Sequence, residues 1–169
     1  MKNQGFTLVE LLIAMVLIGL MTGMAMLSMG NADQSKQQQL EAKRLSMILA
    51  LAEQEAMVRS DAIAVEFFSQ GYQFLSLQGN HWQPIVDDEI FKAHELQRPL
   101  QLTLQQDEQS VYINQKSGMT QNPQPQLVIT PDGISENIKV SISHDKSDVW
   151  YGVKNSEEGW TVSSVDVLP

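Results

Sequence analysis

The residues with the clearest chemical potential lie at the start of the chain, where Gly5 and Phe6 stand about one helical turn before Glu10. Glu10 is the only charged residue between Phe6 and Met29, and nearly all the other residues in that run are apolar. A carboxylate at the centre of a membrane helix costs about 2.5 kcal/mol or more, so it is interpreted as functional and needs a cationic partner. The run contains no Lys or Arg. A cut between Gly5 and Phe6 would supply that cation as a new α-amino group.

Residues elsewhere in the chain show no pattern typical of catalysis. The three histidines are isolated, with no H-x-x-x-H or H-E-x-x-H spacing, and no Gly-x-Ser-x-Gly motif is present. They are His81, His94 and His144. We therefore predict that the chain is not an enzyme and has no cofactor.

Two further groups of side chains are weak candidates for a ligand site. The acidic run at 87–89 (Asp-Asp-Glu) has the oxygen ligands that a cation needs, but such a run is more often a solvated loop, so no metal is predicted. The tryptophans are expected to be core or edge aromatics rather than a ligand platform; they are Trp82, Trp150 and Trp160.

The apolar run that contains Glu10 predicts a membrane-spanning helix at residues 6–30. Phe6 to Met29 would extend roughly 36 Å as a helix, and the hydrocarbon core of a bilayer is about 30 Å thick. Gly19 and Gly23 form a Gly-x-x-x-Gly pair, which lets two helix backbones approach closely. The alternative interpretation of the glycines is that Gly is simply common in membrane helices.

Two alternative interpretations of this start are possible. A cleaved secretory signal has an apolar region of about 7–15 residues, which is shorter than this run, and Glu10 would lie inside it. The other alternative is a plain membrane anchor with an incidental Glu. Neither alternative is favoured; the length of the run and the position of Glu10 count against the secretory signal.

Residues 31–59 predict a continuation of the same helix. Neither Pro nor Gly occurs between Asn31 and Arg59, and apolar residues recur at helical spacing. Those expected to face a globular domain are Leu45, Ile48, Leu49, Ala52 and Ala56, with Met47, Leu51 and Val58 widening that face. The alternative is two helices with a break near Gly30 and Asn31.

From residue 62 onward the pattern changes to short strands. Alternating segments separated by Gly, Pro, Asn and Asp predict seven or eight strands in consecutive hairpins, which favours an antiparallel sheet. A turn is expected at 69–71, and a loop with room for one short helical turn at 84–99. The expected strands are 62–68, 72–77, 100–104, 110–114, 126–130, 138–142, 149–153 and 160–167.

Charge and composition limit the partners of the chain. The net charge of −9 makes nucleic acid an unexpected partner, because phosphate binding requires a basic face. The absence of Cys excludes a disulfide framework and thiolate metal sites. Lys2 before the apolar run places the N-terminus on the cytoplasmic side and sends the remainder across the membrane.

The N-terminal residues resemble the leader of type IV pilins and type II secretion pseudopilins. A short leader with Lys2, then Gly5, Phe6 and Glu10, matches the signal that a prepilin peptidase cuts after the glycine before it N-methylates the phenylalanine. The resemblance implies a type IV pilin-like α+β fold, a long N-terminal helix packed on an antiparallel sheet domain. It also implies a leader at 1–5, a membrane half at 6–30 and a periplasmic domain at 31–169, with Glu10 as the charge that docks subunits.

The C-terminal segments are similar to the GspH/FimT group of minor pseudopilins. They are 98–102 (Arg-Pro-Leu-Gln-Leu), 125–129 (Pro-Gln-Leu-Val-Ile), the turn at 132–133 and 138–143. The resemblance implies a structural subunit near the tip of a type II secretion pseudopilus, first held in the bacterial inner membrane. Its implied partners are the prepilin peptidase, other major and minor pseudopilins, membrane lipid and secreted proteins. The alternative is a minor pilin of a type IV pilus that initiates assembly or binds DNA or surfaces.

Overall fold

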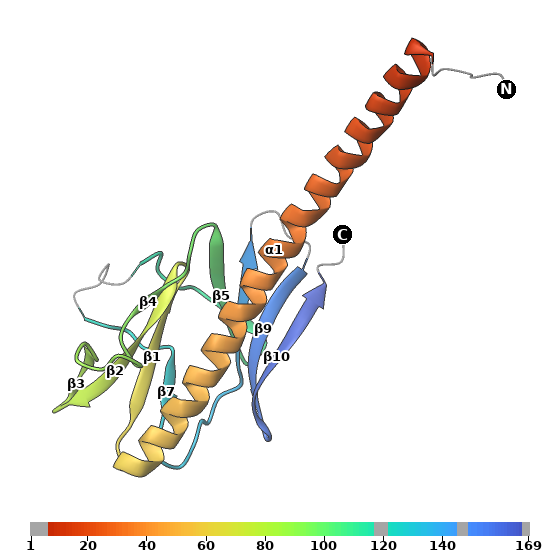
Figure 1. Ribbon diagram of the computed structural model, residues 1–169. Coiled ribbons are helices and arrows are strands. Elements are labelled where there is room, and N and C mark those ends of the chain that lie inside the picture. The colour runs from red at the N-terminus through yellow and green to blue at the C-terminus, as the bar shows by residue number, and fades with distance from the viewer. Residues whose placement is uncertain (1–6, 117–121, 145–148, 167–169) are drawn as a thin grey trace.

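A long helix that projects from a two-sheet body dominates the structure, a computed structural model (Figure 1). The structure describes residues 7–116, 122–144 and 149–166, with side chains at 25–34 and 165–166 left undescribed. Within those ranges there is one helix, α1 (Leu8–Arg59), and ten strands in two sheets. All the strand pairs are antiparallel, so the predicted α+β fold is confirmed.

Helix α1 is continuous, so the break considered near Gly30 does not occur. Thr7 caps its N-terminus in an extended conformation, and its hydroxyl accepts the backbone N–H of Glu10. At the other end Ser60 adopts a left-handed conformation with φ of 54°, which stops the helix after Arg59.

The second half of α1 packs against the body through one stripe of small and branched residues. Ala42, Leu45, Leu49, Ala52 and Ala56 are completely buried there. They recur at three- and four-residue spacing and therefore share a face.

The buried face of this half is narrower than the sequence predicts. Met47 and Val58 are 71% and 81% exposed, so the prediction that they widen the buried face is wrong. Ile48 and Leu51 lie at the margin of the core. Each residue turns the helix by 100°, which places Met47 and Val58 on the far side from Leu45 and Leu49.

The first sheet has the order β3-β2-β1-β7, with β4 paired to β2 beside β3. Its strands are β1 (Ile63–Phe68), β2 (Gly71–Gln78), β3 (His81–Pro84), β4 (His94–Glu95) and β7 (Leu127–Ile129). Strand β3 was not expected, and β4 lies in the segment predicted as a loop. Both are short and exposed, so neither has the alternation of apolar residues that marks a half-buried strand.

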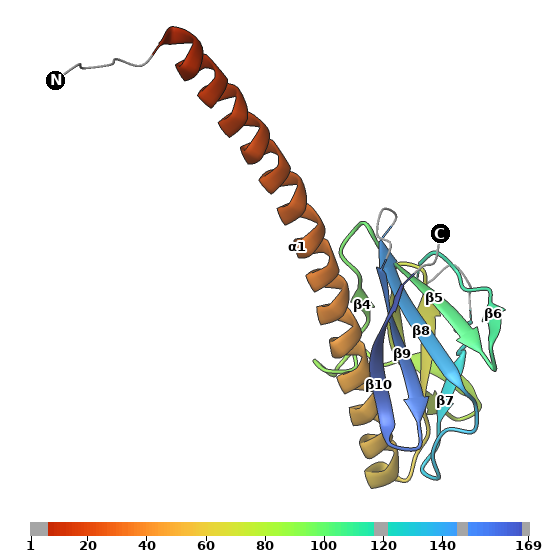
Figure 2. The ribbon, with the colours of Figure 1, turned by 90° about the vertical axis from the view of Figure 1, so that its right-hand side faces the viewer.

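The second sheet has the order β10-β9-β8-β5-β6. Its strands are β5 (Leu100–Gln106), β6 (Gln109–Val111), β8 (Ile138–His144), β9 (Val149–Ser156) and β10 (Gly159–Asp166). Hairpins join β5 to β6, β8 to β9 and β9 to β10, as the sequence predicts. Helix α1 contacts strands of both sheets and lies beside the second in Figures 1 and 2.

The turn between β1 and β2 explains one glycine. Phe68 pairs with Gly71, so the expected turn is present, with Ser69 and Gln70 between the strands. A Cβ added to Gly71 would lie 2.1 Å from the carbonyl oxygen of His94. Gly71 is therefore required by the close approach of β4 to β2, since any side chain would collide with backbone.

Candidate functional site

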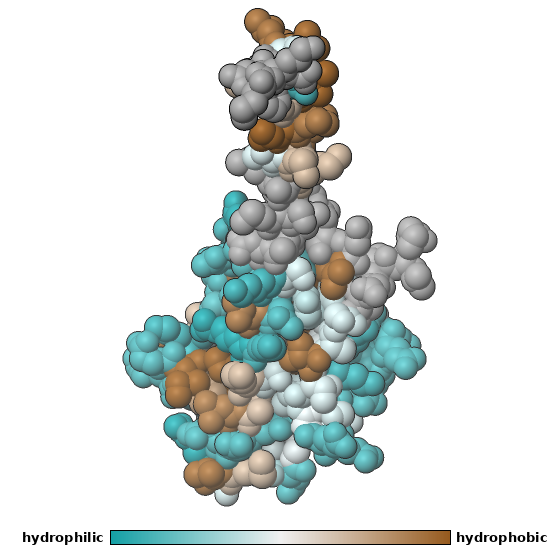
Figure 3. Space-filling model, turned by 45° about the vertical axis from the view of Figure 1, so that its right-hand side comes forward, coloured by the Kyte–Doolittle hydropathy of each residue, from teal (hydrophilic) through white to brown (hydrophobic). Residues whose placement is uncertain are grey.

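The first part of α1 has an exposed apolar surface that the described part of the chain does not cover. Every described side chain from Leu8 to Met24 is exposed, and nearly all are apolar; Leu8, Met15 and Met21 are more than 70% exposed. In Figure 3 brown surface is visible on this projecting segment where grey atoms do not hide it, whereas the body is mostly teal and white with a few brown patches. Contiguous apolar surface of this kind marks a site for protein or membrane contact.

Glu10 lies at the start of this surface and belongs to a capping motif. Its backbone N–H donates to the Thr7 hydroxyl at 3.3 Å, and Thr-x-x-Glu is the spacing of a capping box. Thr7 was not among the predicted site residues, although that spacing is visible in the sequence. The Glu10 carboxylate is exposed and, among the described residues, makes no hydrogen bond or ion pair. Gly5 and Phe6 lie outside the described residues, so the suggested pairing between the Phe6 amine and Glu10 stays a prediction.

Gly19 and Gly23 lie one turn apart on the exposed helix. A Cβ added to either would meet no atom within 4 Å, so the chain itself gives neither position a reason to be Gly. Their lack of side chains leaves room for another helix to approach the backbone. This arrangement fits the predicted packing role, but no described segment of the chain packs against the two glycines.

A second apolar surface continues on the lower half of α1, on the side away from the sheets. A shallow groove of about 390 Å³ is lined by Leu40, Lys43, Arg44, Met47, Ile48 and Leu51. Leu40 is 57% exposed, and Met47 and Val58 are more so. Helix α1 is therefore apolar on two opposite sides, and the sheets cover only one of them.

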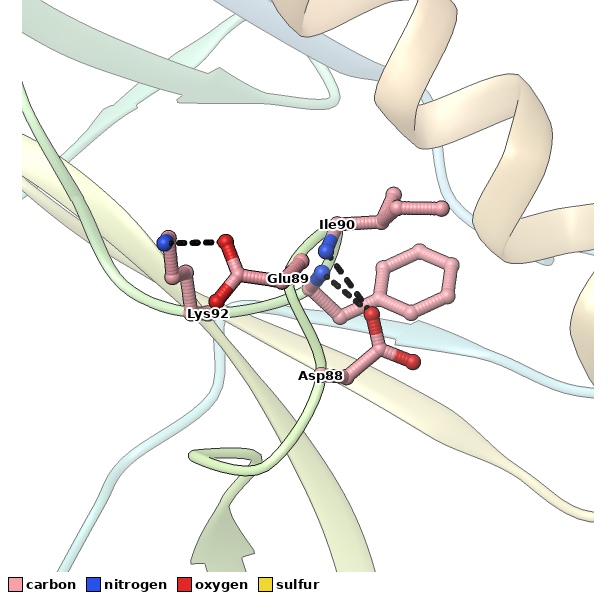
Figure 4. A network of polar contacts seen from close by, with 5 residues as sticks. Asp88, Glu89, Ile90 and Lys92 are labelled. Carbon is pink, nitrogen blue, oxygen red and sulfur yellow. Dashed lines mark hydrogen bonds and ion pairs between the residues drawn. The ribbon is translucent and has the colours of Figure 1, made fainter.

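The acidic run at 87–89 is engaged in local contacts. The Asp88 carboxylate accepts the backbone N–H groups of Ile90 and Phe91 at 2.8 and 3.2 Å, and Glu89 pairs with Lys92 at 2.6 Å (Figure 4). These contacts are those of an Asx turn followed by a helical turn. Among the described residues, no group of three His, Cys, Asp or Glu side chains is placed to hold a metal ion.

The histidines and tryptophans are separated in the fold. His94 pairs with Glu41 of α1 at 3.0 Å, His144 is buried at the end of β8, and His81 is exposed on β3. Trp160 donates its ring N–H to Glu53 of α1 at 3.1 Å, which joins β10 to the helix. Trp82 and Trp150 are half-buried on strands β3 and β9.

Over the described residues, no helix has the length and apolarity that crossing a membrane requires. The predicted membrane-spanning segment at 6–30 includes positions outside that description and stays a prediction.

Comparison with known families accounts for both parts of the chain. Residues 1–26 match the prokaryotic N-terminal methylation motif, and residues 41–163 match the model of the type II transport protein GspH. The chain belongs to the GspH family. The GspH match covers the lower half of α1 and the sheets almost to the end of β10.

Two curated relatives align with most of the chain. Type II secretion system protein H of Pseudomonas aeruginosa is 26% identical over 98% of this chain and 96% of its own length. The protein of the same name from Aeromonas hydrophila is 23% identical over 89% of this chain and 86% of its own.

Solved structures share the fold. The minor pseudopilin EpsH of Vibrio cholerae superposes with a TM-score of 0.61 at 20% identity, covering 78% of this chain and 94% of that one. The solution structure of Escherichia coli GspH gives a TM-score of 0.57 at 17% identity, covering 82% of this chain and 94% of that one. The pilin-like architecture expected from the sequence is confirmed.

Proposed function

We propose that this chain is a minor pseudopilin, a structural subunit near the tip of a type II secretion pseudopilus that supports protein export across the outer membrane. The observation that carries this proposal is the exposed apolar run Leu8–Met24 of α1, which has Glu10 near its start and projects from a folded body. Membership of the GspH family favours this function over the type IV pilus alternative. The role is structural, and its partners are other major and minor pseudopilins.

The subunit is first held in the bacterial inner membrane. Lipid covers the upper half of α1, the N-terminus is cytoplasmic, and the body lies in the periplasm. A prepilin peptidase cuts between Gly5 and Phe6 and methylates the new amine of Phe6. The match of residues 1–26 to the N-terminal methylation motif supports this processing.

Assembly transfers the apolar helix surface from lipid to neighbouring helices. The exposed carboxylate of Glu10 pairs with the N-terminal amine of an adjacent subunit, because an unpaired charge in a low-dielectric interior is penalised by several kcal/mol. Gly19 and Gly23 allow close approach of a second helix, and the groove at Leu40 and Met47 extends the contact down the same helix.

Replacement of Glu10 by Gln tests the docking charge. Gln keeps the size of the side chain and suits a capping box, so the helix start should be preserved. We expect Glu10→Gln to insert and be cut after Gly5 like the wild type, as read by mass spectrometry of the N-terminal peptide. Crosslinking to other pseudopilins in membranes should fall by about tenfold, the effect of roughly 1.4 kcal/mol.

Thr7→Ala is the matched control. It removes the hydroxyl cap at the same helix start but keeps the carboxylate, so it should retain most of the crosslinking. Equal crosslinking by Glu10→Gln and wild type would exclude Glu10 as the docking charge. A mature chain that does not begin at Phe6 would exclude the proposed processing.

A further inference from the structure

The face of the second sheet that points away from α1 carries two facing lysines. Lys139 on β8 and Lys154 on β9 are directly opposite each other in the register of the two strands. Their chain neighbours Ile138, Val140 and Val153 are fully buried in the core. Because successive side chains of a strand point to opposite faces, both lysines lie on the outer face of the sheet. Figure 2 shows this sheet beside α1.

The outer face is hollowed around this pair. The hollow has a volume of about 670 Å³, and its lining includes Gln105 of β5 and Ser163 of β10. Gly152, opposite Ser163 in the register, contributes no side chain, and a Cβ there would lie 3.3 Å from Cε of Lys139. The stem of Lys139 therefore lies across Gly152, and the amide of Gln105 and the hydroxyl of Ser163 line the same hollow.

The two lysines face each other without a carboxylate paired to either one among the described residues. Like charges directly opposite in a sheet destabilise it. An anionic group placed over Lys139 and Lys154 would relieve the repulsion and use both ammonium groups.

The acidic turn at one end of the hollow restricts the anion. Asp107 and Glu108 connect β5 to β6 and line the same hollow, and the Asp107 carboxylate accepts the backbone N–H of Asn137 at 3.3 Å. A polyanion such as nucleic acid would be repelled by these two carboxylates. A protein segment with one or two carboxylates fits, since its backbone N–H groups can face the acidic end.

We propose that this hollow is a docking site for an acidic segment of a partner protein. A Glu or Asp side chain lies over Lys139 and Lys154, and Gln105 and Ser163 hydrogen-bond to its backbone. Helix α1 packs against the opposite face of β8 and β9, so the site stays open when α1 is buried by assembly. The site therefore adds a second, outward-facing contact to the helix-mediated assembly proposed above.

Peptide binding to the purified full chain in detergent micelles tests this site. The probes are a fluorescent, end-blocked Ser hexapeptide that carries two Glu residues, the same peptide with Gln for Glu, and single-stranded oligothymidine. We expect the Glu peptide alone to bind, with anisotropy that falls at high salt. The double variant Lys139→Gln/Lys154→Gln should weaken binding by about fivefold or more, as loss of two exposed ion pairs predicts.

The double variant Lys36→Gln/Lys92→Gln is the matched control, because it removes the same charge from exposed positions elsewhere. It should bind the Glu peptide like the wild type. Equal weakening by both double variants, no saturable binding of the Glu peptide, or tighter binding of oligothymidine would each overturn the proposal.

Thermal unfolding provides an independent measurement. Lys154→Gln removes one of two facing like charges, so its melting temperature should equal or exceed that of the wild type. A clear fall would mean that the lysines stabilise the fold, and the argument that they await an anion would fail. Crosslinking through α1 is unaffected by this variant, which separates the result from a failure of the proposed function.

Discussion

At the scale of single residues, Glu53 shows how the helix is joined to the last strand at an electrostatic cost. Its carboxylate is partly buried between α1 and β10 and accepts the ring N–H of Trp160 at 3.1 Å. Burial raises the pKa of Glu53 above its usual value, and the hydrogen bond from Trp160 offsets only part of that rise. The charged carboxylate therefore opposes folding at neutral pH.

The raised pKa of Glu53 predicts the direction in which stability changes with pH. A raised pKa means that the folded state binds more protons, so stability decreases as pH rises from just below 4.5 through the folded pKa. Glu53→Gln keeps an acceptor for Trp160 without the charge. We expect it to raise the melting temperature at pH 7, with a gain in the free energy of unfolding of no more than about 1 kcal/mol, because the carboxylate is only partly buried and solvent screens its charge.

The pH dependence of the same variant is its control. The advantage of Glu53→Gln over the wild type should shrink between pH 7 and pH 4, where the wild-type carboxyl takes up its proton. Calorimetry at several pH values measures this, and an advantage that stays constant with pH would show that charge is not its cause.

At the scale of elements, α1 carries two apolar stripes with different functions. Leu45 and Leu49 belong to the stripe that the sheets cover, whereas Leu40 and Met47 lie on the uncovered side. The covered stripe stabilises the fold by burying apolar surface. In our proposal the uncovered stripe serves assembly, because exposed apolar side chains contribute little to folding.

Two substitutions on α1 separate these functions. Leu49→Ala should lower the free energy of unfolding by about 2–5 kcal/mol, since Leu49 is completely buried. Met47→Gln, at a position 71% exposed, should change stability by less than about 0.5 kcal/mol and yet reduce crosslinking to other pseudopilins. Chemical denaturation and membrane crosslinking measure the two effects; retained crosslinking by Met47→Gln would remove the groove from the assembly surface.

At the scale of the whole molecule, the core lies in the body and the lower half of α1. Its buried residues begin at Gln38 and Ala42 and end at Val153, while Leu8 to Met24 are exposed throughout the described side chains. Leu8 to Met24 therefore add no buried apolar area to the fold of one isolated subunit.

A fragment that starts at Asp33 should consequently fold alone. It keeps Ser35, whose hydroxyl contacts that of Tyr151 at 3.2 Å, and the whole buried stripe of α1. We expect a soluble monomer with mixed helix and strand by circular dichroism and a cooperative thermal transition. An aggregated or unfolded product would show that the predicted boundary near residue 31 is wrong.

The sequence by itself determined the elements with strong local signals. The helical pattern toward Arg59 and the alternating strands β5 and β8 follow from residue type and spacing, although only the structure excludes a break near Gly30. Local spacing suffices there because the periods of a helix and a strand can be recognised from neighbouring residues in the sequence. The family was indicated by resemblance of the N-terminal and C-terminal segments, and the GspH match bears it out. The short strands β3 and β4 were missed because they are held by pairing to β2, a contact that local sequence does not encode.

Only the tertiary structure decided which apolar surfaces are covered. Residues on both sides of α1 recur at helical spacing, and nothing in that pattern distinguishes Leu49 from Met47. The sheets make the difference by packing on one side, with Trp160 and Tyr151 reaching α1 from strands more than a hundred residues away. The facing of Lys139 and Lys154 likewise depends on strand register, which is set by long-range pairing between β8 and β9.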